Sequence, residues 1–217
     1  MTHTVDLFWS FRSPYSYLAI PRILEITRDY DVAVNVRPVY PIAIRNPKFF
    51  SDVNPLWIPY LMTDITRVGE MNNIPISWPR PDPVNMNRET KEVPADQPYI
   101  HRLTHLGIAA AEAGDGLAFI DQISRLIWNG ETRGWQKGDH LSNAAAKAGF
   151  DLAHLDQLIS ADFDVYDAKV SENQQALEQS GHWGVPTLAY NGEAFFGQDR
   201  IDLCLWRMKK NGLNARL

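Results

Sequence analysis

The sequence contains almost no cysteine. Among its 217 residues the only one is Cys204, which cannot form a disulfide within the chain and excludes any redox cycle between two protein thiols. Its neighbours Leu203 and Leu205 predict a buried structural position, because a free cysteine packs as a small hydrophobic side chain. If this protein carries out sulfur chemistry, the sulfur must come from outside the chain.

Long apolar runs and an excess of positive charge are also missing. The longest apolar stretches are far too short to cross a bilayer, and the opening MTHTVDLFWS lacks the basic, apolar and small-residue order of a signal peptide. Lys and Arg number 21 against 26 Asp and Glu, a net charge of −5, so nucleic acid is not an expected partner. We expect a cytoplasmic protein that does not bind membranes.

Several common catalytic signatures are absent as well. The chain has no Gly-rich phosphate loop and no G-x-S-x-G elbow. His101 and His105 share one face of an expected helix, but no Asp or Glu stands at the matching position for a metal site. We therefore expect no bound metal.

Two short strands flank a helix in the first forty residues. Apolar residues alternate with others over residues 5–9 and again over 32–36, as in half-buried strands, and recur at helical spacing over 14–26. Ser13 is a good N-cap, and Pro14 suits the first helical position, where no backbone N–H is needed. A right-handed crossover would place the two strands parallel in one sheet.

The middle of the chain, from Pro41 to about Gly181, is predicted to be helical, apart from one proline-rich stretch that cannot form a regular helix. The expected helices cover residues 59–72, 99–113, 116–129, 139–149, 151–160 and 162–180, with Asp139 and Asp151 as N-caps and Gly114, Gly149 and Gly181 as stops. No repeat period stands out.

The C-terminal part returns to strands. Strands are expected over 185–190 and 193–196, joined by Asn191-Gly192, a strong hairpin signal, and a last helix runs from about Asp199 to Lys210. The order of elements is therefore βαβ, a long helical stretch, then ββα. This order predicts an α/β fold with a large all-helical insertion.

The turn between the first strand and the first helix carries the segment SPYS, residues 13–16. A helix N-terminus presents unpaired N–H groups and about half a positive charge, so it favours a thiolate over its thiol. A hydroxyl that donates to the thiolate adds about 1.5–3 kcal/mol. Ser13 is thus a candidate to hold an external thiolate; the alternative is that it only caps its helix.

Two other loops also contain candidate residues. In GVPT, residues 184–187, the proline lies inside an expected strand, where it cannot donate a hydrogen bond. A cis Val185–Pro186 bond would explain it and would leave the Val185 N–H and C=O free to pair with an extended peptide; the alternative is an edge-strand proline. In FGQDR, residues 196–200, Asp199 is a natural N-cap, and its carboxylate beside helix N–H groups would suit an amino-acid head group or would only cap the helix.

Together these segments resemble a known family. SPYS stands where glutaredoxins carry CPYC, and GVPT matches the cis-proline loop of thioredoxin-fold proteins. The chain is similar, nearly from end to end, to the 2-hydroxychromene-2-carboxylate isomerases and kappa-class glutathione transferases, relatives of the disulfide oxidoreductase DsbA. The likeness is carried by VDLFWSFRSPYSYLA, IAIRN, PYLMTDITRVGEMNNIPI and HWGVPTLAYNGEAFFGQDRID. It implies a thioredoxin-like domain formed by residues 1–40 and 182–217, with a helical insertion domain over 41–181.

The resemblance also implies glutathione as the cofactor and assigns its contacts. Ser13 would hold the glutathione sulfur and act as the catalytic residue. The Val185 main chain would pair with the cysteinyl backbone of the tripeptide, and Gln198 and Asp199 would hold the γ-glutamyl end. A small aromatic substrate and a homodimer are further expectations from the family.

The sequence departs from the family pattern at several positions. Arg12 precedes the serine where a leucine is usual, and we expect it either to pair with a substrate carboxylate or to point into solvent. Trp57 falls where kappa-class members carry a lysine, which leaves Asn46, Ser51 and Asn54 as polar candidates for further glutathione contacts. The stretch PRPDPVNMNRETKEVPADQP is longer than usual, and we expect it to reshape the substrate pocket.

These residues lead to the hypothesis of a glutathione-dependent isomerase. In it, a bound thiolate adds to a conjugated carbon of an aromatic substrate, a bond rotates or a ring opens, and the thiolate leaves. Tyr15, Trp9 and Trp183 are candidates to line the aromatic site, with core packing as the alternative for each. Other hypotheses are a transferase that releases a glutathione conjugate, a thiol–disulfide oxidoreductase and a non-catalytic glutathione-binding protein.

Overall fold

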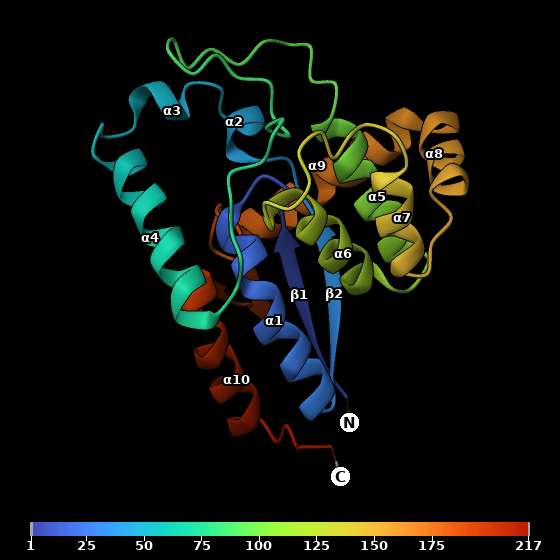
Figure 1. The fold of residues 1–217 in the computed structure, drawn as a ribbon. Coiled ribbons are helices and arrows are strands. Elements are labelled where there is room, and N and C mark those ends of the chain that lie inside the picture. The colour runs from blue at the N-terminus through green and yellow to red at the C-terminus, as the bar shows by residue number, and fades with distance from the viewer. Residues whose placement is uncertain (1, 217) are drawn as a thin grey trace.

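A four-stranded mixed sheet lies at the centre of the structure, a computed structural model that describes residues 2–216 (Figure 1). The strands are β1 (His3–Trp9), β2 (Val32–Pro38), β3 (Thr187–Tyr190) and β4 (Glu193–Phe196), in the order β2-β1-β3-β4. β1 and β2 are parallel, with His3 opposite Val32 and Trp9 opposite Pro38, whereas β3 is antiparallel to β1 and to β4. The parallel arrangement of β1 and β2 is the one predicted.

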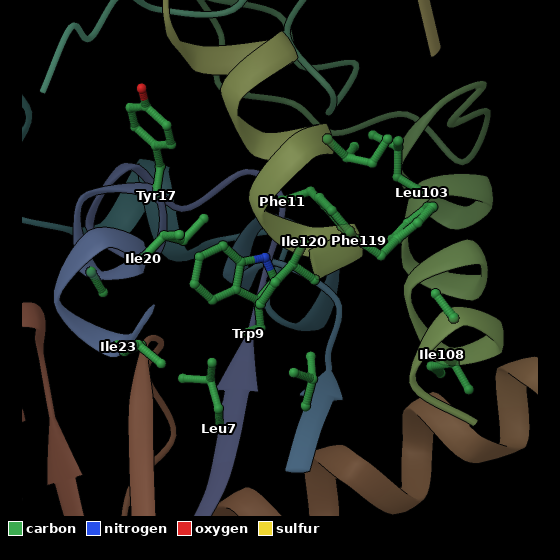
Figure 2. Packing of buried hydrophobic residues seen from close by; sticks show 14 of the residues in the cluster. Leu7, Trp9, Phe11, Tyr17, Ile20, Ile23, Leu103, Ile108, Phe119 and Ile120 are labelled. Atoms are coloured by element: carbon green, nitrogen blue, oxygen red, sulfur yellow. The ribbon is translucent and has the colours of Figure 1, made fainter. Parts of the chain in front are cut away.

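Helix α1 (Pro14–Asp29) joins β1 to β2 and packs on one face of the sheet. Successive side chains of a strand point to opposite faces, so Leu7 and Trp9 of β1 meet Ile20 of α1 in the core (Figure 2). On the other face, Phe8 packs against Leu177 of helix α9 (Phe163–Gln179). Each such fully buried side chain contributes about 1.5–3 kcal/mol.

The chain between β2 and β3 is helical, as predicted. Its helices are α2 (Ile42–Arg45), α3 (Phe49–Asp52), α4 (Trp57–Asn72), α5 (Ile100–Glu112), α6 (Gly116–Trp128), α7 (His140–Lys147), α8 (Leu152–Ala161) and α9. Leu103 of α5 and Phe119 of α6 join Trp9 in one hydrophobic core (Figure 2), so the packing continues from the sheet into the insertion. The proposed domain boundaries at residues 40 and 181 remain a prediction.

The last helix, α10 (Ile201–Lys210), lies beside α1. Its Cys204 is fully buried, as predicted. Among the residues that the structure describes, no helix combines the length and the apolar character that a membrane crossing requires.

Two details of the predicted elements were wrong. β3 begins at Thr187 and not at Val185, because Val185 and Pro186 form the turn that precedes it. Asp199 does not cap the last helix: it lies inside a short 3₁₀ turn, η1 (Gln198–Arg200), and Arg200 occupies the N-cap position of α10. The extra turn is closed by the bond from the Arg200 N–H to the carbonyl of Gly197 (3.1 Å), a glycine with a positive φ of 105°.

Most predicted helix ends were right. Asp151 caps α8 by accepting the Ala153 N–H, whereas Asp139 occupies the N-cap position of α7 without making a side-chain bond. The three glycines predicted as stops, Gly114, Gly149 and Gly181, all follow helices with positive φ angles of 109°, 86° and 106°.

The proline-rich segment, residues 74–98 between α4 and α5, is fastened to the helices beneath it. It runs back alongside α1 before arching over the top of the molecule (Figure 1). The Tyr17 hydroxyl donates to the Pro75 carbonyl (2.8 Å), the Trp135 indole to the Pro81 carbonyl (2.9 Å) and the Ser77 N–H to α6 (2.7 Å). Since proline supplies no N–H, these bonds to carbonyl groups fix an irregular backbone.

A buried polar cluster anchors the turn after β2. The Tyr40 hydroxyl donates to Asp167 Oδ1 (2.5 Å) and lies 2.8 Å from His105 Nε2 and 3.0 Å from His101 Nδ1. Because the hydroxyl gives its one hydrogen to Asp167, both histidine nitrogens must donate to its oxygen. His105 Nδ1 is left buried and unpartnered. Burial lowers the pKa of both histidines and raises the pKa of Tyr40.

We expect acid to destabilise the fold through this cluster. The unfolded chain protonates these histidines near their ordinary pKa of about 6.5, whereas the folded chain resists protonation to lower pH. The free energy of unfolding should therefore fall below about pH 6.5, by at most about 1.4 kcal/mol per pH unit for each histidine. Urea unfolding followed by circular dichroism between pH 7.5 and 5.5 measures this slope. The double variant His101→Gln/His105→Gln should show a flatter profile.

The control for this experiment is a double variant of two exposed histidines, His140→Gln/His154→Gln. It should keep the slope of the wild type, since neither side chain belongs to the Tyr40 cluster. An equally steep profile in the cluster variant would contradict the assignment of the slope to His101 and His105.

Candidate functional site

Ser13 joins two distant parts of the chain at the start of α1. As the N-cap, its Oγ accepts the Ser16 N–H (3.2 Å), and the same hydroxyl donates to the Val185 carbonyl (3.2 Å). The Val185–Pro186 peptide bond is cis, as predicted. Ser13 therefore caps its helix, as predicted, and also contacts the cis-proline loop, whereas its role in holding a thiolate remains a prediction.

The Val185 backbone is only half free. Its carbonyl accepts the Ser13 hydroxyl, which corrects the expectation that both backbone groups were available. Its N–H makes no hydrogen bond within residues 2–216. The carbonyl is occupied because the N-cap of α1 lies close to the cis-proline loop. An incoming acceptor can bind the N–H directly, but a donor must displace the Ser13 hydroxyl to reach the carbonyl.

A cavity of about 290 Å³, which we call the Ser13 cavity, lies between these two loops and the insertion. It is lined by Ser10, Arg12, Ser13, Pro14, Tyr15, Pro41, Ile42, Arg45, Phe49, Phe50, Trp57, Leu61, Trp78, Trp183, Gly184, Val185 and Phe196. The lining comes from the start of α1, the turn after β2, helices α2 to α4, the proline-rich segment and the cis-proline loop. Its mostly apolar wall with a few polar groups is typical of a small-molecule site.

Aromatic side chains form one wall of the Ser13 cavity. The Phe49 ring packs edge-on against Trp57, with centroids 5.6 Å apart, and lies 5.8 Å from Trp183. Trp183 and Tyr15 thus line the cavity, as expected. Trp9 does not, because it points to the face of β1 that α1 covers and is completely buried in the core (Figure 2).

Tyr15 lines the cavity, but its phenol is not free to donate a proton to a ligand. Its hydroxyl donates to Asp64 Oδ2 of α4 (2.5 Å). Burial and, next, the hydrogen bond to Asp64 raise the pKa of this phenol well above its ordinary value. Tyr15 therefore stays protonated and ties the first turn of α1 to α4.

Arg12 neither points into solvent nor is free for a substrate, so both expectations for it were wrong. Its buried guanidinium donates to the two carboxylate oxygens of Asp82 (2.9 and 3.1 Å) and lies over the rings of Phe50 (5.1 Å) and Trp78 (5.6 Å). Asp82 also accepts the Trp78 indole N–H (3.2 Å) and the Val84 N–H (2.9 Å). The proline-rich segment thus supplies the carboxylate that neutralises Arg12.

Arg45 is a cation that the sequence analysis missed. Its Nε donates to the Tyr40 carbonyl (2.7 Å), but within residues 2–216 no carboxylate lies within 4.0 Å of its guanidinium. Burial lowers the pKa of this group, and the charge of Glu178 opposes that effect. A partly buried, unpaired charge favours an anionic ligand. The signal was its place in IAIRN, directly after the second strand of the βαβ unit.

None of the three polar candidates from the loop before α4 lines the Ser13 cavity. Asn46 lines a neighbouring hollow, Ser51 lines a separate groove, and the Asn54 side chain accepts the Leu56 N–H at the start of α4. Trp57, which stands in place of the family lysine, does line the cavity.

Gln198 and Asp199 lie on η1, outside the cavity lining. The turn is held to the cis-proline loop by the bond from the Gly197 N–H to the Pro186 carbonyl (2.9 Å). Asp199 pairs with the neighbouring Arg200 (2.6 Å), an exposed contact that adds little stability. The role of Gln198 and Asp199 in holding a γ-glutamyl group remains a prediction.

His182 orders the cis-proline loop, a role that the sequence analysis did not assign. Its Nδ1 accepts the Gly184 N–H (2.8 Å), and its ring stacks on Phe196 with centroids 3.9 Å apart. Burial lowers the pKa of this histidine. A neutral imidazole with the hydrogen on Nε2 therefore holds in place the backbone that leads into Val185.

The Ser13→Cys variant would report the electrostatics of this site. We expect its thiol pKa to fall below the ordinary value of about 8.5, because the N-terminus of α1 favours the thiolate. Adding Asp82→Asn leaves the Arg12 charge unbalanced and should lower this pKa by about one further unit, whereas adding Arg12→Leu should raise it. Cys204 does not interfere, since burial raises the pKa of its thiol to about 12.

The pH dependence of alkylation by iodoacetamide, followed by mass spectrometry, measures these values. Ser13→Cys combined with Asp156→Asn is the matched control, because that change frees a different arginine, Arg102, on an exposed pair outside the cavity lining. A thiol pKa that is the same in all four variants would show that the Arg12–Asp82 pair does not act on position 13.

The chain matches the family model described as a DSBA-like thioredoxin domain over residues 4–209. A 2-hydroxychromene-2-carboxylate isomerase of Pseudomonas sp. (strain C18) is 25% identical over 210 residues, which covers 91% of this chain and 86% of that protein. A solved 2-hydroxychromene-2-carboxylate isomerase has a TM-score of 0.71 and 21% identity, with 96% of this chain and 95% of that chain covered.

The cytosolic disulfide reductase DsbM from Pseudomonas aeruginosa, solved with GSH, has a TM-score of 0.56 and 16% identity, with 95% of this chain and 99% of that chain covered. The structural likenesses confirm the thioredoxin-type α/β fold with a helical insertion, and the family match spans nearly the whole sequence. This chain belongs to the DSBA-like thioredoxin domain family.

Proposed function

We propose that this chain is a glutathione-dependent isomerase that acts on an aromatic or conjugated electrophile. The observation that carries the proposal is the Ser13 cavity, which combines a helix N-terminus with two groups that lack the following partners within residues 2–216: the Val185 N–H makes no hydrogen bond, and the Arg45 guanidinium has no carboxylate nearby. The chain's one thiol, Cys204, is buried elsewhere. Similarity to a 2-hydroxychromene-2-carboxylate isomerase over most of both chains supports the reaction class. Bound glutathione would supply the nucleophilic sulfur that the chain lacks.

The residues of the cavity fit a thiol-containing peptide. The Val185 N–H is a free backbone donor beside a short extended segment, which suits a peptide carbonyl. The Arg45 guanidinium suits a carboxylate. The Ser13 hydroxyl lies between the α1 N-terminus and the loop, and it can donate to a thiolate by turning away from the Val185 carbonyl. Gln198 and Asp199 are proposed to hold the γ-glutamyl end.

The chain's own side chains would hold charge and exclude water. Ser13 and the first turn of α1 favour negative charge at one end of the cavity. Phe49, Trp57 and Trp183 offer flat apolar faces to an aromatic substrate, and burial against them removes water from the site. These residues position a planar electrophile against the anion-favouring helix end.

A thiol–disulfide oxidoreductase, as some structural relatives are, fits this chain less well. Ser13 and Ser16 occupy the two positions where redox relatives carry cysteines, and Ser16 is completely buried. Disulfide exchange needs a thiolate on the protein. A glutathione transferase would use the same cavity, so only the products separate it from an isomerase.

Calorimetric titration with glutathione tests the proposed cofactor. We expect the wild type to bind with a depressed thiol pKa, read from thiolate absorbance, and Ser13→Ala to lose at least tenfold in affinity, in keeping with a charge-assisted bond of about 1.5–3 kcal/mol. Ser13→Thr, which keeps the hydroxyl and the cap, should retain binding. Ser142→Ala, an unrelated serine at the surface of α7, is the control. A wild type that fails to bind at millimolar glutathione would end the proposal.

Product analysis separates isomerase from transferase. With 2-hydroxychromene-2-carboxylate as the probe substrate, an isomerase should convert it while the free glutathione concentration stays constant over many turnovers. Consumption of one glutathione for each substrate, with a conjugate visible by mass spectrometry, would assign a transferase instead. Binding of glutathione without turnover of this substrate or of a panel of aromatic electrophiles would leave a binding protein.

A further inference from the structure

A second hollow, of about 420 Å³, lies against the Ser13 cavity, and we call it the second chamber. Arg12, Phe50, Leu61 and Trp78 line both spaces, so the Arg12 stack forms the partition between them. The apolar lining of the second chamber consists of Phe50, Ile58, Leu61, Met62, Trp78 and Met86. Helix α4 and the proline-rich segment supply most of this surface.

Three cations face the same hollow. Arg80, Arg88 and Lys91 line it, and within residues 2–216 no carboxylate lies within 4.0 Å of their charged nitrogens. The single acid in the lining is Asp82, whose oxygens already serve Arg12 and its neighbours. In a chain with a net charge of −5, this hollow concentrates unbalanced positive charge around an apolar floor.

The backbone that carries these cations is held in place. The Arg80 carbonyl accepts the Gly134 N–H (2.7 Å). Arg88 and Lys91 lie in a closed turn, in which the Asn87 N–H donates to the Glu92 carbonyl (2.9 Å) and the Lys91 N–H to the Asn87 carbonyl (2.9 Å). The cations are therefore presented by a fixed loop and not by a free tail, which lowers the entropy lost when a ligand binds.

We propose that the second chamber binds the acidic end of the electrophile. The apolar body of this ligand lies against Trp78 and the α4 side chains, and its carboxylate or similar acidic group meets Arg80, Arg88 and Lys91. The inference rests on the proposed function, since the reacting end of the molecule must then lie in the Ser13 cavity. Arg12 is not the acid-binding group, because Asp82 neutralises it.

This assignment defines the shape of the substrate. The substrate extends past the Arg12 partition, is apolar along its length and carries its negative charge at the end remote from the reacting sulfur. An electrophile of the same body without the acid would lose the contacts to the three cations. The proline-rich segment, which supplies all three, is then the part of the chain that determines substrate specificity.

Binding of unreactive probes without glutathione tests the proposal. The probes are 4-phenylbutyrate, its neutral amide and 4-phenylbutylamine, which share one apolar body and differ in charge. We expect the carboxylate to bind about tenfold more tightly than the amide, and the amine least, because several partly exposed cations each contribute modestly. In Arg80→Gln/Arg88→Gln/Lys91→Gln the carboxylate and amide should bind alike. Calorimetry or saturation-transfer NMR measures the affinities.

The matched control is Lys137→Gln/Lys147→Gln/Lys210→Gln, which removes the same charge from exposed lysines outside the chamber and should keep the preference for the carboxylate. Equal binding of the three probes to the wild type, or an equal loss in both triple variants, would overturn the proposal. If the wild type binds glutathione but shows no preference for the carboxylate probe, only the proposal for the second chamber is contradicted. If the wild type prefers the carboxylate probe but does not bind glutathione, only the proposed glutathione-dependent function is contradicted.

Discussion

The ion pair between Arg12 and Asp82 determines how the site is built. A buried guanidinium without its carboxylate would cost about 3–5 kcal/mol, so the proline-rich segment must cross the start of α1 where Asp82 meets Arg12. This crossing brings Trp78 to the guanidinium, which also lies over the Phe50 ring of α3, and closes one side of the Ser13 cavity. A leucine at position 12 would not require a carboxylate partner, and the segment would lose this ion pair while keeping its bonds to Tyr17, Trp135 and α6.

The Arg12–Asp82 pair also determines where charge lies in the cleft, by which we mean the Ser13 cavity and the second chamber together. Arg12 is neutralised at the partition, whereas Arg45 on one side and the three cations of the second chamber on the other lack carboxylate partners in the described chain. The centre of the cleft is therefore aromatic and nearly neutral, and its two ends favour anions. Such a pattern suits a flat body with separated negative charges, because each charge avoids the apolar middle, where desolvation costs most.

Local sequence patterns predicted the order of strands and helices. They failed where a feature of the structure depends on contacts between residues that lie far apart in the sequence. Period-two and helical spacings identified β1, α1 and β2, and the cis Val185–Pro186 bond followed from a proline misplaced in a strand. The partner of Arg12 lies 70 residues away in an irregular segment, so no spacing rule could find it. The four-residue helices α2 and α3 are likewise too short to show a period.

Under the proposed function, the Ser13 hydroxyl explains how a chain without a reactive thiol would hold an external one. The positive end of α1 favours a thiolate whether the sulfur belongs to the protein or to a ligand. The oxygen of a serine at position 13 accepts the Ser16 N–H and donates to the Val185 carbonyl, so it holds the cis-proline loop against the start of α1. In the proposed function, the serine therefore keeps the helix end and the cis-proline loop in place, and glutathione would supply the sulfur from outside the chain.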